Sequence, residues 1–138
     1  YLFAYILDQS KGKIEYIKNY AKANNLDLII KGSDSQLSVD DSIEKWIANF
    51  RDANYIITDS FHGTVFSIIF NKPFIAVGNE ARGMSRFNSL LSRFGLEDRL
   101  IDISKEHKIP TSNIDWTKIN LNIEACRITA ISFLTNNL

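Results

Sequence analysis

The sequence predicts one α/β domain, a Rossmann-like parallel sheet with helices on both faces. Short, continuously apolar segments alternate about four times with segments whose apolar residues recur every three or four positions. Continuous apolar runs are typical of strands that are covered on both faces. The chain has 138 residues, of which 45% are apolar, and this is enough for one hydrophobic core. We therefore treat residues 1–138 as a single domain.

The first part of the chain alternates clearly between the two patterns. Residues 1–7 are a continuous apolar run and predict a buried strand. Residues 11–24 predict a helix, because their apolar side chains fall on one side and lysines occupy much of the rest. Residues 26–30 predict a second buried strand.

The next helix has the clearest start. The sequence Ser38-Val39-Asp40-Asp41 resembles a capping box with Asp in place of the more usual Glu. Between residues 43 and 50, apolar side chains recur at i, i+3, i+4 and i+7, which predicts an amphipathic helix. Residues 54–58 then predict a third strand.

The middle of the chain continues the same order. Residues 62–70 are apolar nearly all round and predict a buried helix, and residues 74–77 predict a fourth strand. A polar loop is expected over residues 78–83. Apolar residues at helical spacing then predict a helix over residues 84–94.

The last part of the chain is less regular. Residues 100–103 predict a fifth strand, residues 106–118 predict a loop that contains Trp116, and residues 121–134 predict the last helix. Ile123, Cys126, Ala130 and Leu134 fall on one side of that helix, so we expect Cys126 to be an inert core thiol.

Composition excludes several classes of protein. Sixteen basic residues balance sixteen acidic ones, so we expect no nucleic-acid partner. A single cysteine excludes an internal disulfide or a cysteine-based zinc site and favours a cytoplasmic protein. No apolar run is long enough for a transmembrane segment. Because the chain starts inside an expected strand, we expect it to be one domain of a longer protein.

The run Asp59-Ser60-Phe61-His62-Gly63-Thr64 breaks the apolar pattern after the third strand, at the end where a parallel sheet binds ligands. Ser60 is the expected N-cap of the next helix, whose first turn offers N–H groups to a phosphate or carboxylate. Gly63 allows close approach of a ligand or a neighbouring strand. His62 would then lie beside the anion as hydrogen-bond or proton donor, unless it is a satisfied buried histidine. We expect Asp59 to act as a cap or to orient His62 rather than to react, and Thr64 to be structural.

The loop after the fourth strand adds cations. Arg82 can offer a planar fork of donors to an anion, and Arg86, four residues later, falls on the same side of a helix. For Arg86 and Arg93 a solvated basic face is the simpler interpretation. No metal site is expected, since no residues have the spacing of metal ligands.

The residues 58–67, and then Asn71-Lys72-Pro73-Phe74, resemble the polysaccharide pyruvyl transferase family. Arg82-Gly83, Ser85-Arg86-Phe87 and the segment 96–99 fit the same resemblance, which covers roughly residues 38–100 well and the remainder loosely. It implies a two-domain architecture like a GT-B glycosyltransferase, of which this chain would be the C-terminal half, with the N-terminal domain missing.

The resemblance implies transfer of a pyruvyl group from phosphoenolpyruvate to a pair of sugar hydroxyls in surface or exopolysaccharide synthesis. The family histidine matches His62, which with Asp59 would be catalytic. The donor phosphate would be bound by the residues around it: Ser60, Phe61, Gly63, Thr64, Arg82 and Arg86. Many family members have an arginine where this chain has Ser60. The implied acceptor is a saccharide or lipid-linked saccharide, no cofactor is implied, and the implied place is the cytoplasm or the inner face of the membrane.

Two other functions remain open on the sequence alone. A nucleotide-sugar glycosyltransferase of the same architecture would need a carboxylate for the ribose, and Glu80 is the nearby candidate. A non-catalytic module that binds an anionic sugar is the other alternative.

Overall fold

The computed structural model describes residues 1–32, 42–78, 83–105 and 107–138. In these ranges it has an all-parallel five-stranded sheet with the strand order β2-β1-β3-β4-β5. The strands are β1 (Leu2–Tyr5), β2 (Leu28–Lys31), β3 (Tyr55–Thr58), β4 (Phe74–Val77) and β5 (Leu100–Ile101). The helices are α1 (Lys11–Ala23), α2 (Ile43–Asp52), α3 (Phe61–Ile69), α4 (Met84–Phe94), the short 3-10 helix η2 (Glu97–Arg99) and α5 (Trp116–Asn137).

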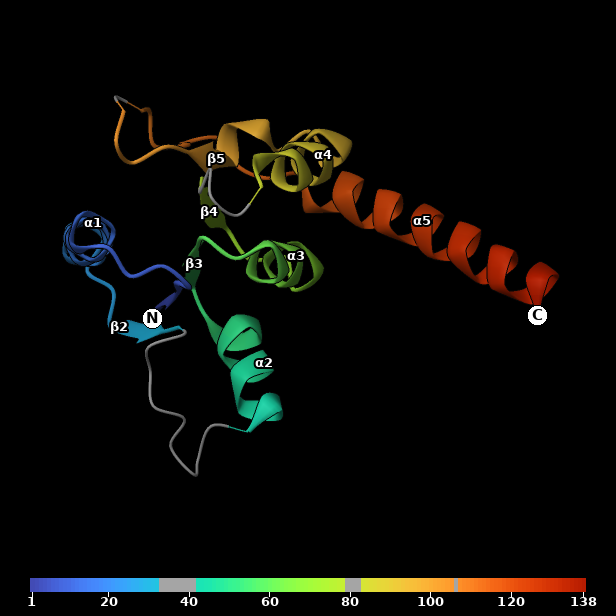
Figure 1. The fold of residues 1–138 in the computed structure, drawn as a ribbon, viewed down its shortest axis with the longest axis horizontal. Coiled ribbons are helices and arrows are strands. Elements are labelled where there is room, and N and C mark those ends of the chain that lie inside the picture. Colours follow the sequence, from blue (N-terminus) through green and yellow to red (C-terminus); the bar gives the residue numbers. More distant parts are fainter. Residues whose placement is uncertain (33–41, 79–82, 106) are drawn as a thin grey trace.

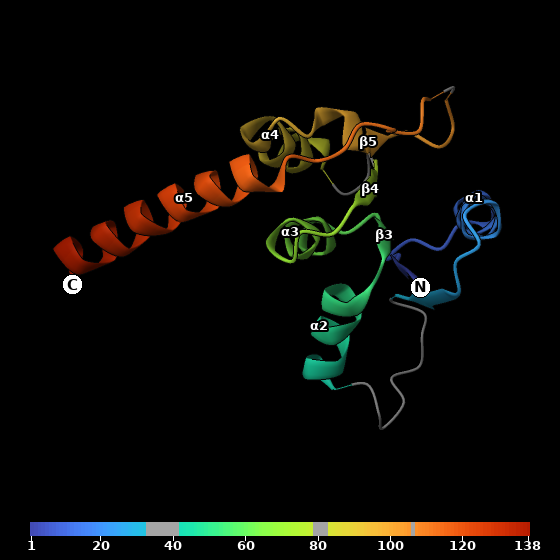
Figure 2. The ribbon, with the colours of Figure 1, turned by 180° about the vertical axis from the view of Figure 1, so that it is seen from behind.

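Helices cover both faces of the sheet. α2, α3 and α4 lie on one side and α1 on the other, as the two opposite views show (Figures 1 and 2). Successive strand residues alternate between two apolar clusters: Phe3 and Ile56 pack toward α2 and α4, and Ala4 and Ile57 toward α1. The fold is therefore the predicted Rossmann-like one.

The strand order places a topological switch point between β1 and β3. β1 pairs with β2 on one side and with β3 on the other, and the helices that follow β1 and β3 lie on opposite faces of the sheet. In open parallel sheets a ligand crevice forms outside the carboxyl ends of the strands at such a point. The loops that leave β1 and β3 are therefore the first place to look for a site.

Side-chain caps define where two helices begin. The Ser10 hydroxyl accepts a hydrogen bond from the Lys13 N–H at the start of α1, and the Ser42 hydroxyl accepts one from the Lys45 N–H at the start of α2. The capping box predicted at residues 38–41 lies outside the described residues. α2 begins at Ile43, after its N-cap Ser42.

The second strand differs from its prediction. We expected residues 26–30 to be covered on both faces, but all four residues of β2 are only half-buried. The reason is position: β2 is the first strand in the sheet order and, among the described strands, pairs with β1 alone. An apolar run therefore indicated a strand correctly but did not show that the strand lies at an edge.

The last helix is longer than predicted. α5 begins at Trp116, because the Asp115 carboxylate accepts a hydrogen bond from the Lys118 N–H and caps it. The prediction of a loop over residues 106–118 is therefore wrong for residues 116–118, which are helical. Trp116 is the first residue of the helix and packs against the apolar cluster on the α2–α4 face.

The expected core side of α5 is confirmed at Ile123, which packs against the apolar cluster on the α2–α4 face, and is wrong farther along the helix. The helix extends away from the sheet beyond its first turns (Figures 1 and 2). Cys126 is half-buried, and its thiol lies 3.6 Å from the Asn122 side-chain oxygen. Ala130 and Leu134, expected on the same buried side, are exposed. In the described part of the chain, no helix is both long enough and apolar enough to cross a membrane.

Candidate functional site

Ser60 connects the end of β3 to the first turn of α3. Its hydroxyl accepts a hydrogen bond from the Gly63 N–H at 3.3 Å, and its carbonyl accepts one from the Thr64 N–H at 3.0 Å. Ser60 is therefore the predicted N-cap, and its own N–H donates to the Thr58 hydroxyl. Helix geometry leaves the N–H groups of Phe61 and His62 as the first-turn donors without an intrahelical acceptor. Those two groups are the ones an anion could accept from.

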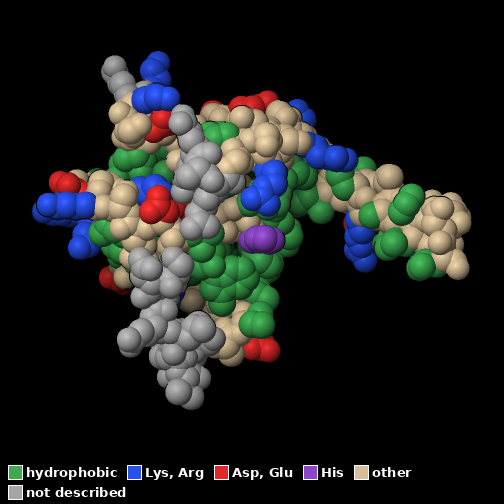
Figure 3. All heavy atoms as spheres, viewed as in Figure 1, with side chains coloured by type: hydrophobic (Ala, Val, Ile, Leu, Met, Phe, Trp, Pro, Cys, Tyr) green, Lys and Arg blue, Asp and Glu red, His purple; other side chains and the backbone are tan. Residues whose placement is uncertain are grey.

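His62 is exposed at the surface of α3. Its ring lies edge-on to the ring of Phe61, with 5.9 Å between the centroids. Figure 3 shows a histidine at the surface over α3, among hydrophobic side chains and next to a basic one. The alternative of a buried, satisfied histidine is therefore wrong, and the imidazole can reach a ligand from solvent.

Gly63 and Thr64 face inward. A Cβ atom at Gly63 would lie 2.4 Å from the Thr58 hydroxyl oxygen, so this glycine permits the close approach of α3 to β3. The Thr64 side chain is fully buried, and its hydroxyl donates to the Ser60 carbonyl at 3.0 Å. Both residues position the first turn, and a ligand could reach them only through their backbone. Thr64 is structural, as expected.

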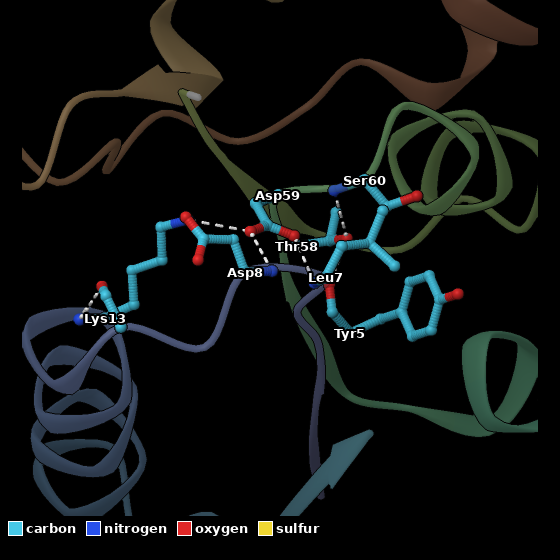
Figure 4. Close-up of polar contacts among 8 residues, drawn as sticks. Tyr5, Leu7, Asp8, Lys13, Thr58, Asp59 and Ser60 are labelled. Carbon is cyan, nitrogen blue, oxygen red and sulfur yellow. Dashed lines mark hydrogen bonds and ion pairs between the residues drawn. The ribbon is translucent and has the colours of Figure 1, made fainter. Parts of the chain in front are cut away.

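Asp59 binds the loop between β1 and α1 (Figure 4). Its carboxylate accepts hydrogen bonds from the Leu7 N–H at 2.7 Å and the Asp8 N–H at 3.1 Å, and it pairs with the Lys13 ammonium at 2.8 Å. The side chain of Asp59 has no exposed surface. These partners all come from the β1–α1 loop and the start of α1. The cap of α3 is Ser60, and a catalytic role for Asp59 stays a prediction.

A second contact connects β1 and β3 below this loop. The Thr58 hydroxyl donates to the Tyr5 carbonyl at 2.6 Å. Burial, and after it the negative charge of Asp59, raise the pKa of the Tyr5 phenol. The contacts of Thr58 and Asp59 together hold the carboxyl ends of β1 and β3 in fixed register.

An open groove of about 500 Å³ lies beside the first turn of α3. It is lined by the Phe61 ring and by residues of α4, among them Arg86 and Arg93. The guanidinium carbon of Arg86 lies over the Phe61 ring, 5.3 Å from its centroid, in cation–π geometry. Arg86 thus lies beside the predicted site and Arg93 lines the same groove, and both side chains are exposed, as the interpretation of a solvated basic face expects. Arg82 and Glu80 lie outside the described residues.

Sequence reasoning missed Lys13 and Asp8. In the sequence, Asp8 is the acidic residue that ends the first apolar run, and Lys13 is a lysine in the first turn of the first helix. Nothing in the sequence links either of them to Asp59, which lies 46 residues beyond Lys13. Among the residues that the structure describes, no group of three or more His, Cys, Asp or Glu side chains could hold a metal ion.

Comparison with known proteins identifies a family. The sequence model of the family described as polysaccharide pyruvyl transferase matches residues 1–81. This part of the chain runs from β1 through α3 and β4, and it includes the whole run 59–64, while Arg86 lies beyond it. No curated protein and no solved structure matches the chain.

Proposed function

The chain belongs to the polysaccharide pyruvyl transferase family, and from this premise we propose that it transfers the pyruvyl group of phosphoenolpyruvate to two hydroxyls of a sugar. The acceptor we propose is a saccharide or a lipid-linked saccharide of a surface polysaccharide. The observation that carries the proposal is an exposed histidine in a capped first turn, at the carboxyl edge of the sheet. The proposal includes no cofactor. It includes a second Rossmann-like half, as in GT-B enzymes, that faces this edge.

The site suits a donor with close to three negative charges. The N–H groups of Phe61 and His62 point out of the first turn of α3, where the helix dipole also favours an anion. The Arg86 guanidinium lies on the Phe61 ring and brings a positive charge to the same end of the helix. We assign the phosphate to these groups. Arg82 would add a second guanidinium.

Ser60 explains why a cation from α4 is needed. Many family members carry an arginine at this position, but here Ser60 is 3% exposed and its side chain caps α3. A buried cap adds no positive charge to the site. Arg86 then supplies the charge that an arginine at position 60 supplies in those relatives.

The chemistry begins with a proton from His62. The imidazolium protonates the methylene carbon of phosphoenolpyruvate, which becomes a methyl group, and the first sugar hydroxyl bonds to the adjacent carbon. The bond from that carbon to the phosphate oxygen breaks, and the phosphate leaves with the electron pair. The second hydroxyl then bonds to the same carbon and closes the ketal. Of the two protons lost by the hydroxyls, one returns to His62 and the other goes to phosphate.

Electrostatics support the departure of phosphate. Donors that are already in place cost no reorganisation when charge develops on the leaving oxygen. Removal of a general acid typically costs about 10²–10⁴ in rate. His62→Ala should therefore lower turnover by that factor, and it also removes the imidazole contact to the donor, while Arg86 and the Phe61 N–H remain.

An NMR titration with phosphoenolpyruvate, a nucleotide sugar and inorganic phosphate tests the proposal. We expect phosphoenolpyruvate to shift the amide signals of residues 60–64 and the side-chain signal of Arg86. His62→Ala should weaken this response, and the matched control His107→Ala should not, because His107 packs on Tyr16. A response to the nucleotide sugar alone would favour glycosyl transfer and contradict pyruvyl transfer. With the proposed second half present, phosphate release that depends on both a sugar and His62 is the activity to measure.

A further inference from the structure

A second cavity lies on the α1 side of the carboxyl edge. It has a volume of about 700 Å³ and lies between the first turn of α1, the end of β4 and the segment after β5. Cavities that bind small molecules usually measure about 300–1,000 Å³. The described groups of the donor site proposed above lie on α3 and α4, and none of them lines this cavity.

The lining combines an apolar floor with a polar rim. Val77 is buried and Ile103 is half-buried, whereas Asp8, Ser10 and Ser104 are exposed. Carboxylates accept hydrogen bonds from sugar hydroxyls, and serine hydroxyls both donate and accept. Apolar side chains can cover the C–H face of a sugar ring. The mixture therefore fits a polyhydroxylated molecule better than a purely apolar one.

The charges around the cavity disfavour an anion. The Lys13 ammonium is already paired with two carboxylates, Asp59 at 2.8 Å and Asp8 at 3.3 Å. Lys105 pairs with Asp102 at 3.0 Å. Among the described residues around the cavity, three carboxylates, with Asp59 buried behind the rim, accompany two ammonium groups. A trianion bound here would meet a net negative charge. In the groove beside α3 it would instead meet the positive charges of Arg86 and Arg93.

We propose that this cavity binds the neutral sugar acceptor. The carboxylates of Asp8 and Asp102 accept hydrogen bonds from its hydroxyls, and Val77 and Ile103 contact its ring. The inference rests on the proposed pyruvyl transfer, which requires a sugar near the donor. Asp59 connects the two sites. Its carboxylate accepts a hydrogen bond from the Asp8 N–H at the cavity rim, and Asp59 is the first residue of the run 59–64, which contains His62.

Gly12 offers a direct way to fill the cavity. It lies in the first turn of α1 and lines the cavity, and a Cβ atom there would meet nothing within 4 Å. Gly12→Trp would therefore project an indole into the cavity mouth without a clash at its base. Lys18→Trp, on an exposed position of the same helix, is the matched control. Asp102→Ala is a second variant that removes a carboxylate instead of adding bulk, in case the indole disturbs the helix.

The probes are methyl β-galactoside, methyl β-glucoside and methyl α-mannoside, added to the whole chain and followed by NMR. We expect at least one glycoside to shift the signals of Ser10, Gly12 and Ser104 with a millimolar Kd. Gly12→Trp should abolish these shifts, Asp102→Ala should weaken binding about tenfold, and Lys18→Trp should leave it unchanged. Shifts that survive Gly12→Trp, shifts confined to other residues, or no response to any of the three glycosides would each overturn the proposal.

The same titration separates this inference from the proposed function. Phosphoenolpyruvate should shift residues 60–64 equally in the wild type and in Gly12→Trp, because the indole does not reach α3. If the glycosides bind at Gly12 and phosphoenolpyruvate fails at His62, the cavity is a sugar site and the pyruvyl donor is wrong. If phosphoenolpyruvate binds and the glycosides do not, the donor site stands and the acceptor cavity is wrong.

Discussion

The carboxylate of Asp59 lies 2.8 Å from the ammonium of Lys13, and the Asp59 side chain has no exposed surface. The pair joins the end of β3 to the first turn of α1 across the switch point of the sheet. Two N–H groups of the β1–α1 loop complete the coordination of the carboxylate. A buried charge that is paired and hydrogen-bonded in this way fixes how the loops on the two sides of the edge lie against each other.

Removal of the lysine should therefore destabilise the fold. Lys13→Met keeps most of the side-chain volume but leaves the Asp59 carboxylate buried without its cation. We expect the free energy of unfolding to fall by about 3 kcal/mol, the lower end for a broken buried pair, since two N–H donors remain. Urea unfolding measures this change.

Lys18→Met is the matched control for the same experiment. Lys18 is exposed on the same helix, so its replacement should change the free energy of unfolding by less than about 0.5 kcal/mol. Equal effects of the two substitutions would mean that the Asp59–Lys13 pair contributes nothing beyond helix propensity.

Two glycines in comparable first turns should respond in opposite ways to alanine. Gly63→Ala places a Cβ 2.4 Å from the Thr58 hydroxyl oxygen, which already donates to the Tyr5 carbonyl. We expect a loss of about 1–3 kcal/mol, as for an overpacked core. Gly12→Ala meets open space and should stabilise by about 0.4–1 kcal/mol, because it restricts the unfolded chain.

Thermal unfolding of the two alanine variants beside the wild type is the measurement. A Gly63→Ala protein as stable as Gly12→Ala would show that α3 can move away from β3. The close packing of the first turn on Thr58 would then not be what requires glycine at this position.

His62→Ala should leave the thermal midpoint nearly unchanged. The imidazole is exposed, and its described contact is the edge-on packing with Phe61. Exposed substitutions of this kind usually change the free energy of unfolding by less than about 0.5 kcal/mol. A calorimetric scan that showed a drop of several kcal/mol would contradict an accessible histidine and favour a structural one.

Much of the local structure could be predicted because it depends on near neighbours. The strands of the sheet follow from continuous apolar runs, and the cap at Ser60 follows from its place between a strand and a helix. These inferences need only a few adjacent residues. The sequence left open whether His62 is buried or exposed, and only the way the first turn of α3 lies on the sheet decides it.

The rest depends on partners distant in the sequence. Asp59 finds Lys13 only because the sheet brings β1 beside β3, and no local pattern marks that pair. The exposure of β2 is set by its place at the sheet edge. At the exposed end of α5, apolar side chains recur at helical spacing, but no described element packs against them. Periodicity therefore predicted a buried side that this part of the helix does not have.

Asp102, on the rim of the second cavity, gives a prediction about pH. Hydrogen bonds from Ser104, then the ammonium of Lys105, hold the pKa of this carboxyl at about 2, below the usual 3.8. The Ser104 hydroxyl donates to the carboxylate at 2.6 Å and the Ser104 N–H at 3.0 Å. Ser104→Ala removes the hydroxyl and keeps the N–H, so we expect the pKa of Asp102 to rise toward 3.8 without reaching it.

The sign follows from the lowered pKa. A carboxyl whose pKa is lower in the folded state stabilises the fold above its unfolded pKa, and this contribution is lost as the pH falls from about 3.8 to about 2. In Ser104→Ala, Asp102 should contribute less to the stability of the fold. The loss of this contribution on acidification should be complete at a higher pH than in the wild type. A carboxyl-carbon NMR titration of Asp102 in both proteins measures the shift. Identical titration curves would mean that Lys105 and the backbone N–H alone account for the low pKa, and that the Ser104 hydroxyl is free to bind a ligand in the cavity.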